Sequence, residues 1–338
     1  MKNFLFLLSV LLVSVSFGQT AEEYFNQANA KDDLKDYKGA IADYTKAIEL
    51  DPTYVNAYYN RGKAKDNLKD YKGAIADYTK AIELDPTFAF AYYYRGFLKG
   101  DLKDYKGAIV DFTKAIELDS TNANTYYNRG VAKANLEDCR GAIADYNKAI
   151  ELNPADANTY YNRGVEKAKL EDYKGAIVDY TKAIELDPAY IKAYINRGVE
   201  NDILKDCNGA IADFTKAIEL DPANALAYNY RGLTMDNLKD YNGAIANFNK
   251  AIKLDPTYVD AYYNRGNAKC RSQDYKGAIV DYSKAIELDP SYTKAYTYIS
   301  RGVAKYYSSD TDGACLDWNK AGELGHAKAY ELIKKYCK

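Results

Sequence analysis

Residues 70–86 have the sequence DYKGAIADYTKAIELDP, and this stretch decides the fold because the chain repeats it. Close copies begin at Asp36, Asp104, Asp138, Asp172, Asp206, Asp240 and Asp274, with a more divergent copy at Asp310. The first eight copies start 34 residues apart, and the ninth starts 36 residues after the eighth. A fixed period of this length is typical of stacked supersecondary units that each contact only their neighbours.

The repeated stretch has the spacing of an α-helix. Ala74, Tyr78 and Ala81 follow one another at i, i+4 and i+7, which places them on one helical face. An aspartate, here Asp70, begins all nine copies, and its carboxylate can accept hydrogen bonds from the free amides of the first turn. The stretch ends in an Asp-Pro pair at 85–86, which we expect to be the N-cap and first residue of the next helix.

The other half of each unit, residues 56–68 in the second copy, is also predicted to be a helix. A glycine recurs in its middle, at Gly62 and its equivalents, with Ala28 in the first copy. Because a mid-helix glycine costs about 1 kcal/mol relative to alanine, we expect it to let the small Ala74 and Ala81 of the partner helix come close. Each unit is therefore predicted to be a hairpin of two helices.

The spacing of the recurrent residues resembles the tetratricopeptide repeat (TPR). In the second copy these residues are Tyr58, Gly62, Ala74, Tyr78, Ala81 and Pro86. The resemblance covers nine units, near 21–54, 55–88, 89–122, 123–156, 157–190, 191–224, 225–258, 259–294 and 295–325. It implies an all-α fold, a right-handed α-solenoid superhelix of helix-turn-helix hairpins whose first helices line a concave groove.

The two ends of the chain depart from the repeat. Residues 1–18 are predicted to be a secretory signal peptide, because Lys2 precedes an apolar run at 4–17 and a cleavage site is expected near Gly18 and Gln19. That run is shorter than the ~20 residues that a membrane-spanning helix needs. We therefore expect an exported protein, periplasmic or secreted, that does not span the membrane. The repeat array occupies residues 19–325, and residues 326–338 are predicted to form a C-terminal capping helix.

The cysteines predict one disulfide. If two antiparallel helices turn near residues 325–326, residues whose numbers sum to about 652 face one another, as Cys315 and Cys337 do. In an exported protein, a disulfide between them would hold the C-terminal helix in place. Cys139 and Cys207 lie two repeats apart, beyond the ~7 Å Cα limit for a disulfide, and Cys270 is left over.

Composition argues against several classes of function. The chain has 46 Lys and Arg against 48 Asp and Glu, without a long run of one sign, whereas a protein that follows nucleic-acid phosphates needs clustered basic residues. His326 is the only histidine, which leaves no set of imidazoles for a multi-histidine metal site or a catalytic triad. We therefore expect no enzyme activity, no metal, no cofactor and no nucleic-acid partner.

The first helices carry the candidate binding residues. One column on their predicted groove face consists of Asn26, Asn60, Tyr94, Asn128, Asn162, Asn196, Tyr230 and Asn264. A carboxamide at each step offers a donor and an acceptor to the backbone of an extended peptide. The two tyrosine breaks coincide with apolar residues of the kind that anchor a partner, namely Phe90 and Phe97 in one unit and Leu226 and Leu233 in another.

Two interpretations of the asparagine column stay open. The side chains can bind a ligand, or they can hydrogen-bond neighbouring helices and recur because the unit was duplicated. The recurrent arginines, such as Arg61, are expected to pair with nearby acidic residues rather than with a ligand.

The predicted function is a non-catalytic protein–protein interaction scaffold that binds an extended peptide segment of a partner protein in the groove. The alternative is a structural or assembly spacer of the bacterial envelope that acts through its outer and end surfaces, self-association included.

Overall fold

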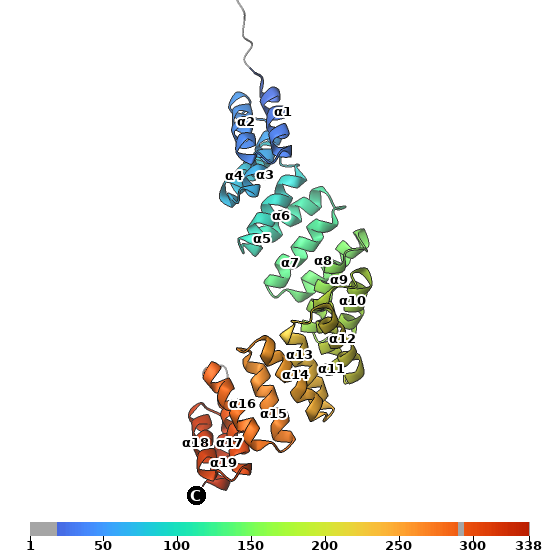
Figure 1. The fold of residues 1–338 in the computed structure, drawn as a ribbon. Coiled ribbons are helices and arrows are strands. Elements are labelled where there is room, and N and C mark those ends of the chain that lie inside the picture. Colours follow the sequence, from blue (N-terminus) through green and yellow to red (C-terminus); the bar gives the residue numbers. More distant parts are fainter. Residues whose placement is uncertain (1–18, 290–293, 338) are drawn as a thin grey trace, which may run out of the picture. The chain divides into compact units, whose positions relative to one another are not determined.

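The computed structural model describes residues 19–289 and 294–337, which form nineteen α-helices and no β-strand. Figure 1 shows these helices following one another as hairpins along the chain. The described residues divide between Leu152 and Asn153 into two compact units. The predicted fold class, an all-α solenoid of helix hairpins, is confirmed. The predicted signal peptide at residues 1–18 lies outside the described residues, and so does the junction at 290–293.

The first unit contains the first four hairpins. Its helices are α1 (Ala21–Asp33), α2 (Tyr37–Leu50), α3 (Val55–Asn67), α4 (Tyr71–Leu84), α5 (Ala89–Asp101), α6 (Tyr105–Leu118), α7 (Ala123–Asn135) and α8 (Cys139–Leu152).

The second unit contains the remaining five hairpins and a final helix. Its helices are α9 (Ala157–Lys169), α10 (Tyr173–Leu186), α11 (Ile191–Ile203), α12 (Cys207–Leu220), α13 (Ala225–Asn237), α14 (Tyr241–Leu254), α15 (Val259–Arg271), α16 (Tyr275–Leu288), α17 (Lys294–Tyr307), α18 (Thr311–Glu323) and α19 (Ala327–Tyr336).

An aspartate caps the second helix of each hairpin, as predicted. Asp70 Oδ1 accepts a hydrogen bond from the Gly73 amide at 3.0 Å, and the same contact recurs in the eight other hairpins. The residue before this cap, Lys69, has a φ of 63°. The equivalent residues in the other hairpins also have a left-handed backbone conformation, and none of them is a glycine. The turn inside each hairpin therefore contains a residue in a conformation that L-amino acids disfavour.

The Asp-Pro pair does not begin the next helix, so this prediction was wrong. Asp85 is the C-cap of α4, where its amide donates to the Ala81 carbonyl. Its carboxylate accepts from the Thr87 amide at 2.9 Å, and α5 begins only at Ala89. An aspartate side chain readily bonds the amide two residues on, so this residue closes the turn between hairpins instead of opening a helix.

The recurrent glycine of the first helix makes room for an aromatic ring of the second helix. A Cβ on Gly62 would lie 2.7 Å from Cε1 of Tyr78, whose side chain is completely buried. The close approach is therefore to the ring, and not to Ala74 or Ala81 as expected.

A buried ion pair joins the two helices of a hairpin. Arg61 on α3 donates to both carboxylate oxygens of Asp77 on α4, from Nε at 3.0 Å and from Nη2 at 2.7 Å. Its third nitrogen, Nη1, donates to Oγ1 of Thr45 on α2 of the preceding repeat at 3.1 Å. Lys65 Nζ lies 2.7 Å from Oδ2 of Asp77, and the Asp77 side chain is only 5% exposed. One arginine thus connects three consecutive helices.

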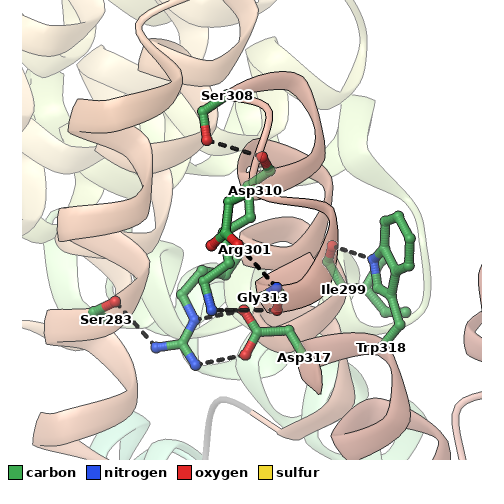
Figure 2. Close-up of polar contacts among 9 residues, drawn as sticks. Ser283, Ile299, Arg301, Ser308, Asp310, Gly313, Asp317 and Trp318 are labelled. Atoms are coloured by element: carbon green, nitrogen blue, oxygen red, sulfur yellow. Dashed lines mark hydrogen bonds and ion pairs between the residues drawn. The ribbon is translucent and has the colours of Figure 1, made fainter. Parts of the chain in front are cut away.

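Figure 2 shows the same arrangement in the ninth hairpin, where Arg301 contacts Asp317 and Ser283. The prediction that these arginines pair with acidic residues is confirmed there and in most other hairpins. In the seventh hairpin Arg231 instead donates to Asn247 at 2.8 Å.

Helix α19 covers the last hairpin of the second unit. Cys337, the residue after α19, forms a disulfide with Cys315 on α18, and their Cα atoms are 5.7 Å apart. The Tyr336 ring packs against Trp318, with ring centroids 5.8 Å apart, and the Tyr330 hydroxyl donates to the Gly322 carbonyl. Covalent and aromatic contacts therefore hold this helix against α18.

Replacing Lys69 by glycine is expected to stabilise its hairpin by about 0.5 to 1 kcal/mol. The left-handed conformation costs an L-residue roughly 1–2 kcal/mol, and the greater freedom of unfolded glycine cancels part of that gain. Lys72→Gly, in the first turn of α4, is the matched control and should destabilise by about 1 kcal/mol. Thermal unfolding followed by circular dichroism measures both, and a lower midpoint for Lys69→Gly would contradict the assignment.

In protein isolated from its native compartment, alkylation without reduction is expected to label Cys139, Cys207 and Cys270, which do not take part in the disulfide. Cys315 and Cys337 should react only after reduction, because their sulfurs are bonded. Mass spectrometry of the alkylated protein reads out the sites, and two free thiols at 315 and 337 would rule the disulfide out.

Candidate functional site

Members of the predicted asparagine column bond the first helix of the preceding repeat. Asn128 Nδ2 donates to the Tyr93 hydroxyl at 3.1 Å, and Asn196 Nδ2 donates to the Tyr161 hydroxyl at 3.2 Å. Burial is the main factor that raises the pKa of both tyrosines, so these hydroxyls stay neutral at physiological pH.

Two further asparagines of the column bond amides instead of hydroxyls. Asn60 Nδ2 donates to Asn29 Oδ1, and Asn264 Nδ2 donates to Asn229 Oδ1, both at 3.1 Å. Asn26 is exposed and Asn162 is half-buried. At four positions, therefore, the side-chain amide hydrogen-bonds a neighbouring repeat. These contacts agree with the interpretation that the column holds neighbouring helices together. The same four side chains are half-buried, so they remain accessible to solvent.

The two tyrosines that interrupt the column pack over buried rings. Tyr94 stacks on Tyr78 of the preceding hairpin with centroids 6.0 Å apart, and Tyr230 stacks on Phe214 with centroids 5.7 Å apart. Each ring therefore covers the aromatic side chain of the hairpin before it, and contributes to packing between repeats.

Three of the four predicted apolar anchors are exposed. The exposed fractions are 52% for Phe90, 39% for Phe97 and 42% for Leu226. Leu233 instead packs against the buried cluster that contains Phe248. Phe90 on α5 is thus the most accessible apolar side chain among the predicted site residues.

A cavity of about 310 Å³ opens between α5 and α7 in the first unit. Phe97 and Phe112 form an aromatic wall, Val131 and Ala132 extend the apolar surface, and the column residue Asn128 also lines it. The structure therefore brings together two residues that the sequence analysis selected for different reasons, Phe97 as an anchor and Asn128 as a hydrogen-bonding group.

Gly100 lines this cavity, and the sequence analysis missed it. A Cβ on Gly100 would meet only the Ala108 Cβ, at 4.0 Å, so packing does not require a glycine here. The equivalent residues in the other repeats all have side chains: Asp32, Asp66, Ala134, Ala168, Asp202, Asp236, Cys270 and Tyr306. The available signal was that Gly100 is the one first-helix glycine that does not recur.

The second unit has a smaller cavity, of about 230 Å³, that is lined by residues of α15 and α17. Cys270, the equivalent of Gly100, lines it together with Arg271 and Lys328. Arg271 also forms an ion pair with Asp236 on α13. This cavity has cationic residues in its wall, whereas the cavity at Gly100 is mainly apolar.

Neither a metal site nor a membrane span is found within residues 19–289 and 294–337. No group of three or more His, Cys, Asp and Glu side chains there is placed to hold a metal ion. No helix in the same ranges combines the length and apolarity needed to cross a bilayer.

Family models for the tetratricopeptide repeat match most of the chain. One model, described as TPR repeat, matches residues 28–66, 100–137, 138–169 and 237–271. Others, described as tetratricopeptide repeat, match residues 55–88, 157–190, 191–224, 214–246 and 259–292. No curated protein matches the sequence.

Several solved structures are similar to this chain. YrrB, described as a TPR protein with an unusual peptide-binding site, is 29% identical with a TM-score of 0.51, and the match covers 54% of this chain and 95% of YrrB. A TPR protein from Parabacteroides merdae is 21% identical, with a TM-score of 0.57 and coverage of 74% and 99%. The C-terminal part of a TPR protein from Cytophaga hutchinsonii is 21% identical, with a TM-score of 0.62 and coverage of 71% and 98%. The last two show a shared fold.

Alanine at Gly100 and at Gly62 should have opposite effects on stability. Gly100→Ala is expected to stabilise by about 1 kcal/mol, because alanine favours the helix and its methyl group enters open space. Gly62→Ala should destabilise by about 1 to 3 kcal/mol, because the methyl group would overlap the Tyr78 ring. Thermal unfolding of the two variants tests this, and a shift in the same direction for both would contradict the cavity.

Proposed function

This chain belongs to the tetratricopeptide repeat family, and on that premise we propose that it is a non-catalytic scaffold that binds an extended segment of a partner protein along its first helices. The observation that carries this proposal is the cavity between α5 and α7, where the exposed Phe97 and the half-buried Asn128 line one concave surface. An apolar cavity with a few polar groups is the usual form of a binding site. An open apolar cavity of this kind also suits the anchoring side chain of a peptide.

The similarity to YrrB supports a peptide as the ligand class. YrrB has a peptide-binding site, and it resembles this chain at 29% identity over 95% of its own length. The asparagine column adds amide groups along the same series of first helices, where an extended backbone would need donors and acceptors.

We also propose that the protein works outside the cytoplasm, in the periplasm or after secretion. The N-terminal 18 residues have the composition of a signal peptide. The disulfide between Cys315 and Cys337 supports this proposal, because such bonds persist in oxidising compartments.

Replacing Asn128, Asn162 and Asn196 together by alanine is expected to abolish capture of the partner and to leave helical content unchanged. The expected loss follows from removing three consecutive amides that would bond the peptide backbone. Crosslinking in native cells, followed by quantitative mass spectrometry of captured proteins, measures capture, and circular dichroism measures helicity.

A second variant separates ligand binding from packing. Tyr93→Phe with Tyr161→Phe removes the hydroxyls that accept from Asn128 and Asn196 but keeps the asparagines, so it should capture the partner normally. If the triple alanine variant still captures its partners, the groove is not the binding surface. That result would favour the alternative function, a structural spacer of the bacterial envelope that acts through its outer and end surfaces.

A further inference from the structure

We propose that the cavity lined by α15 and α17 accepts a carboxylate of the partner segment, carried by an aspartate or glutamate side chain. This inference rests on the proposed function, because it names the chemistry of one residue in the peptide that the first helices would bind. It concerns a different cavity from the one at Gly100, which is the basis of that proposal.

The cavity occupies the same place in its repeat as the cavity at Gly100. Both lie between the first helices of consecutive hairpins, and equivalent residues line them. The equivalent pairs are Phe97 and Asn267, Gly100 and Cys270, Asp101 and Arg271, Phe112 and Tyr282, Asn128 and Ser300, and Val131 and Val303. The repeat therefore forms one kind of cavity twice, and the lining residues that differ give each cavity its own chemistry.

The charged residues of the two linings differ in sign. The first cavity has Asp101 and Lys103, one charge of each sign, whereas the second has Arg271 and Lys328, both cationic. Asp236 on α13 pairs with Arg271. Lys328 is exposed, and within the described residues it forms no ion pair. One positive charge is therefore left over at the second cavity, and it attracts an anion.

The titratable groups around this cavity do not supply the missing negative charge. Burial is the main factor that raises the pKa of the Cys270 thiol and of the Tyr282 hydroxyl, so both groups are neutral at physiological pH. Asp281, which precedes Tyr282 on α16, already pairs with Arg265 and Lys269. A ligand carboxylate would therefore meet an uncompensated cation.

The lining also offers hydrogen-bond donors suited to a carboxylate. The Tyr282 hydroxyl donates to Asn267 Oδ1 at 2.8 Å, which leaves the amide nitrogen of Asn267 to donate to a ligand. Together with the Arg271 guanidinium and the Lys328 ammonium, this amide faces a ligand with N–H groups. Carboxylate oxygens only accept hydrogen bonds, and those from cationic donors are the strong ones.

This set of cations occurs once in the repeat series. The residues equivalent to Arg271 are Asp33, Asn67, Asp101, Asn135, Lys169, Ile203, Asn237 and Tyr307. Lys328 belongs to α19, which the disulfide between Cys315 and Cys337 holds against α18. The C-terminal helix therefore does more than cover the last hairpin, because it places a cation at the cavity.

The variant Lys328→Gln tests the charge, and Lys334→Gln is its matched control. Lys334 is also exposed on α19, but it does not line the cavity. The unmodified chain and both variants are used to select peptides from a phage-displayed library of random dodecamers. Each peptide is joined to the coat protein through its C-terminus, so a selected carboxylate must belong to a side chain. Fluorescence anisotropy then gives the Kd of C-terminally amidated copies.

The expected result is enrichment of peptides with aspartate or glutamate at one fixed position. Lys328→Gln should weaken their binding by about fivefold or more, and Lys334→Gln should leave it within about twofold of the unmodified chain. Replacing the fixed acidic residue by its amide should weaken binding by a similar factor. The two changes together should weaken binding no further than the larger single change, because they remove the same interaction.

Three outcomes would overturn the inference. If the enriched peptides bind Lys328→Gln as tightly as the unmodified chain, the cavity does not take a carboxylate, and the proposed function stands. If Lys334→Gln weakens binding as much as Lys328→Gln does, the attraction comes from the general charge of α19 and not from the cavity. If the unmodified chain enriches no peptide, the proposed function fails and this inference fails with it.

Discussion

The buried arginine–aspartate pair is the interaction that joins the two helices in seven of the described hairpins. Arg61 is held by Asp77 on the second helix and by Thr45 of the preceding repeat, so one side chain sets the register of three helices. A buried ion pair contributes little net stability, because desolvation offsets its attraction, but loss of one partner is strongly destabilising. We therefore interpret the recurrent pair mainly as a device that specifies how hairpins align.

Because the ion pair, the glycine–ring contact and the aspartate cap together hold the hairpin, other positions of the first helix are free to vary. Phe97, Gly100 and Asp101 all occupy such positions, and none is needed for the contacts that recur. Four asparagines of the column donate hydrogen bonds to the first helix of the preceding repeat. The proposed binding residues and the packing residues are thus neighbours on one helix, so a substitution at one position can affect both roles.

Sequence patterns predicted the helices, the aspartate caps and the arginine pairs because each depends on residues close together in one repeat. The Asp-Pro pair was misassigned because proline is compatible with both a helix start and a turn, and the Thr87 contact decided for the turn. Gly62 was correctly selected as a close-contact position, but its partner was misidentified. Only the packed hairpin shows that the Tyr78 ring, rather than an alanine, lies against it.

The sequence by itself determined the fold class, since a 34-residue period with helical spacing in both halves allows each unit to bury its apolar faces only against its neighbours. The tertiary structure alone decided which groove residues are accessible. Tyr94 is stacked and Phe97 is exposed, although both lie on the same predicted face. Gly100 lines a cavity because helices from successive repeats pack side by side. Contacts between residues some 35 positions apart depend on that packing, and no local pattern encodes them.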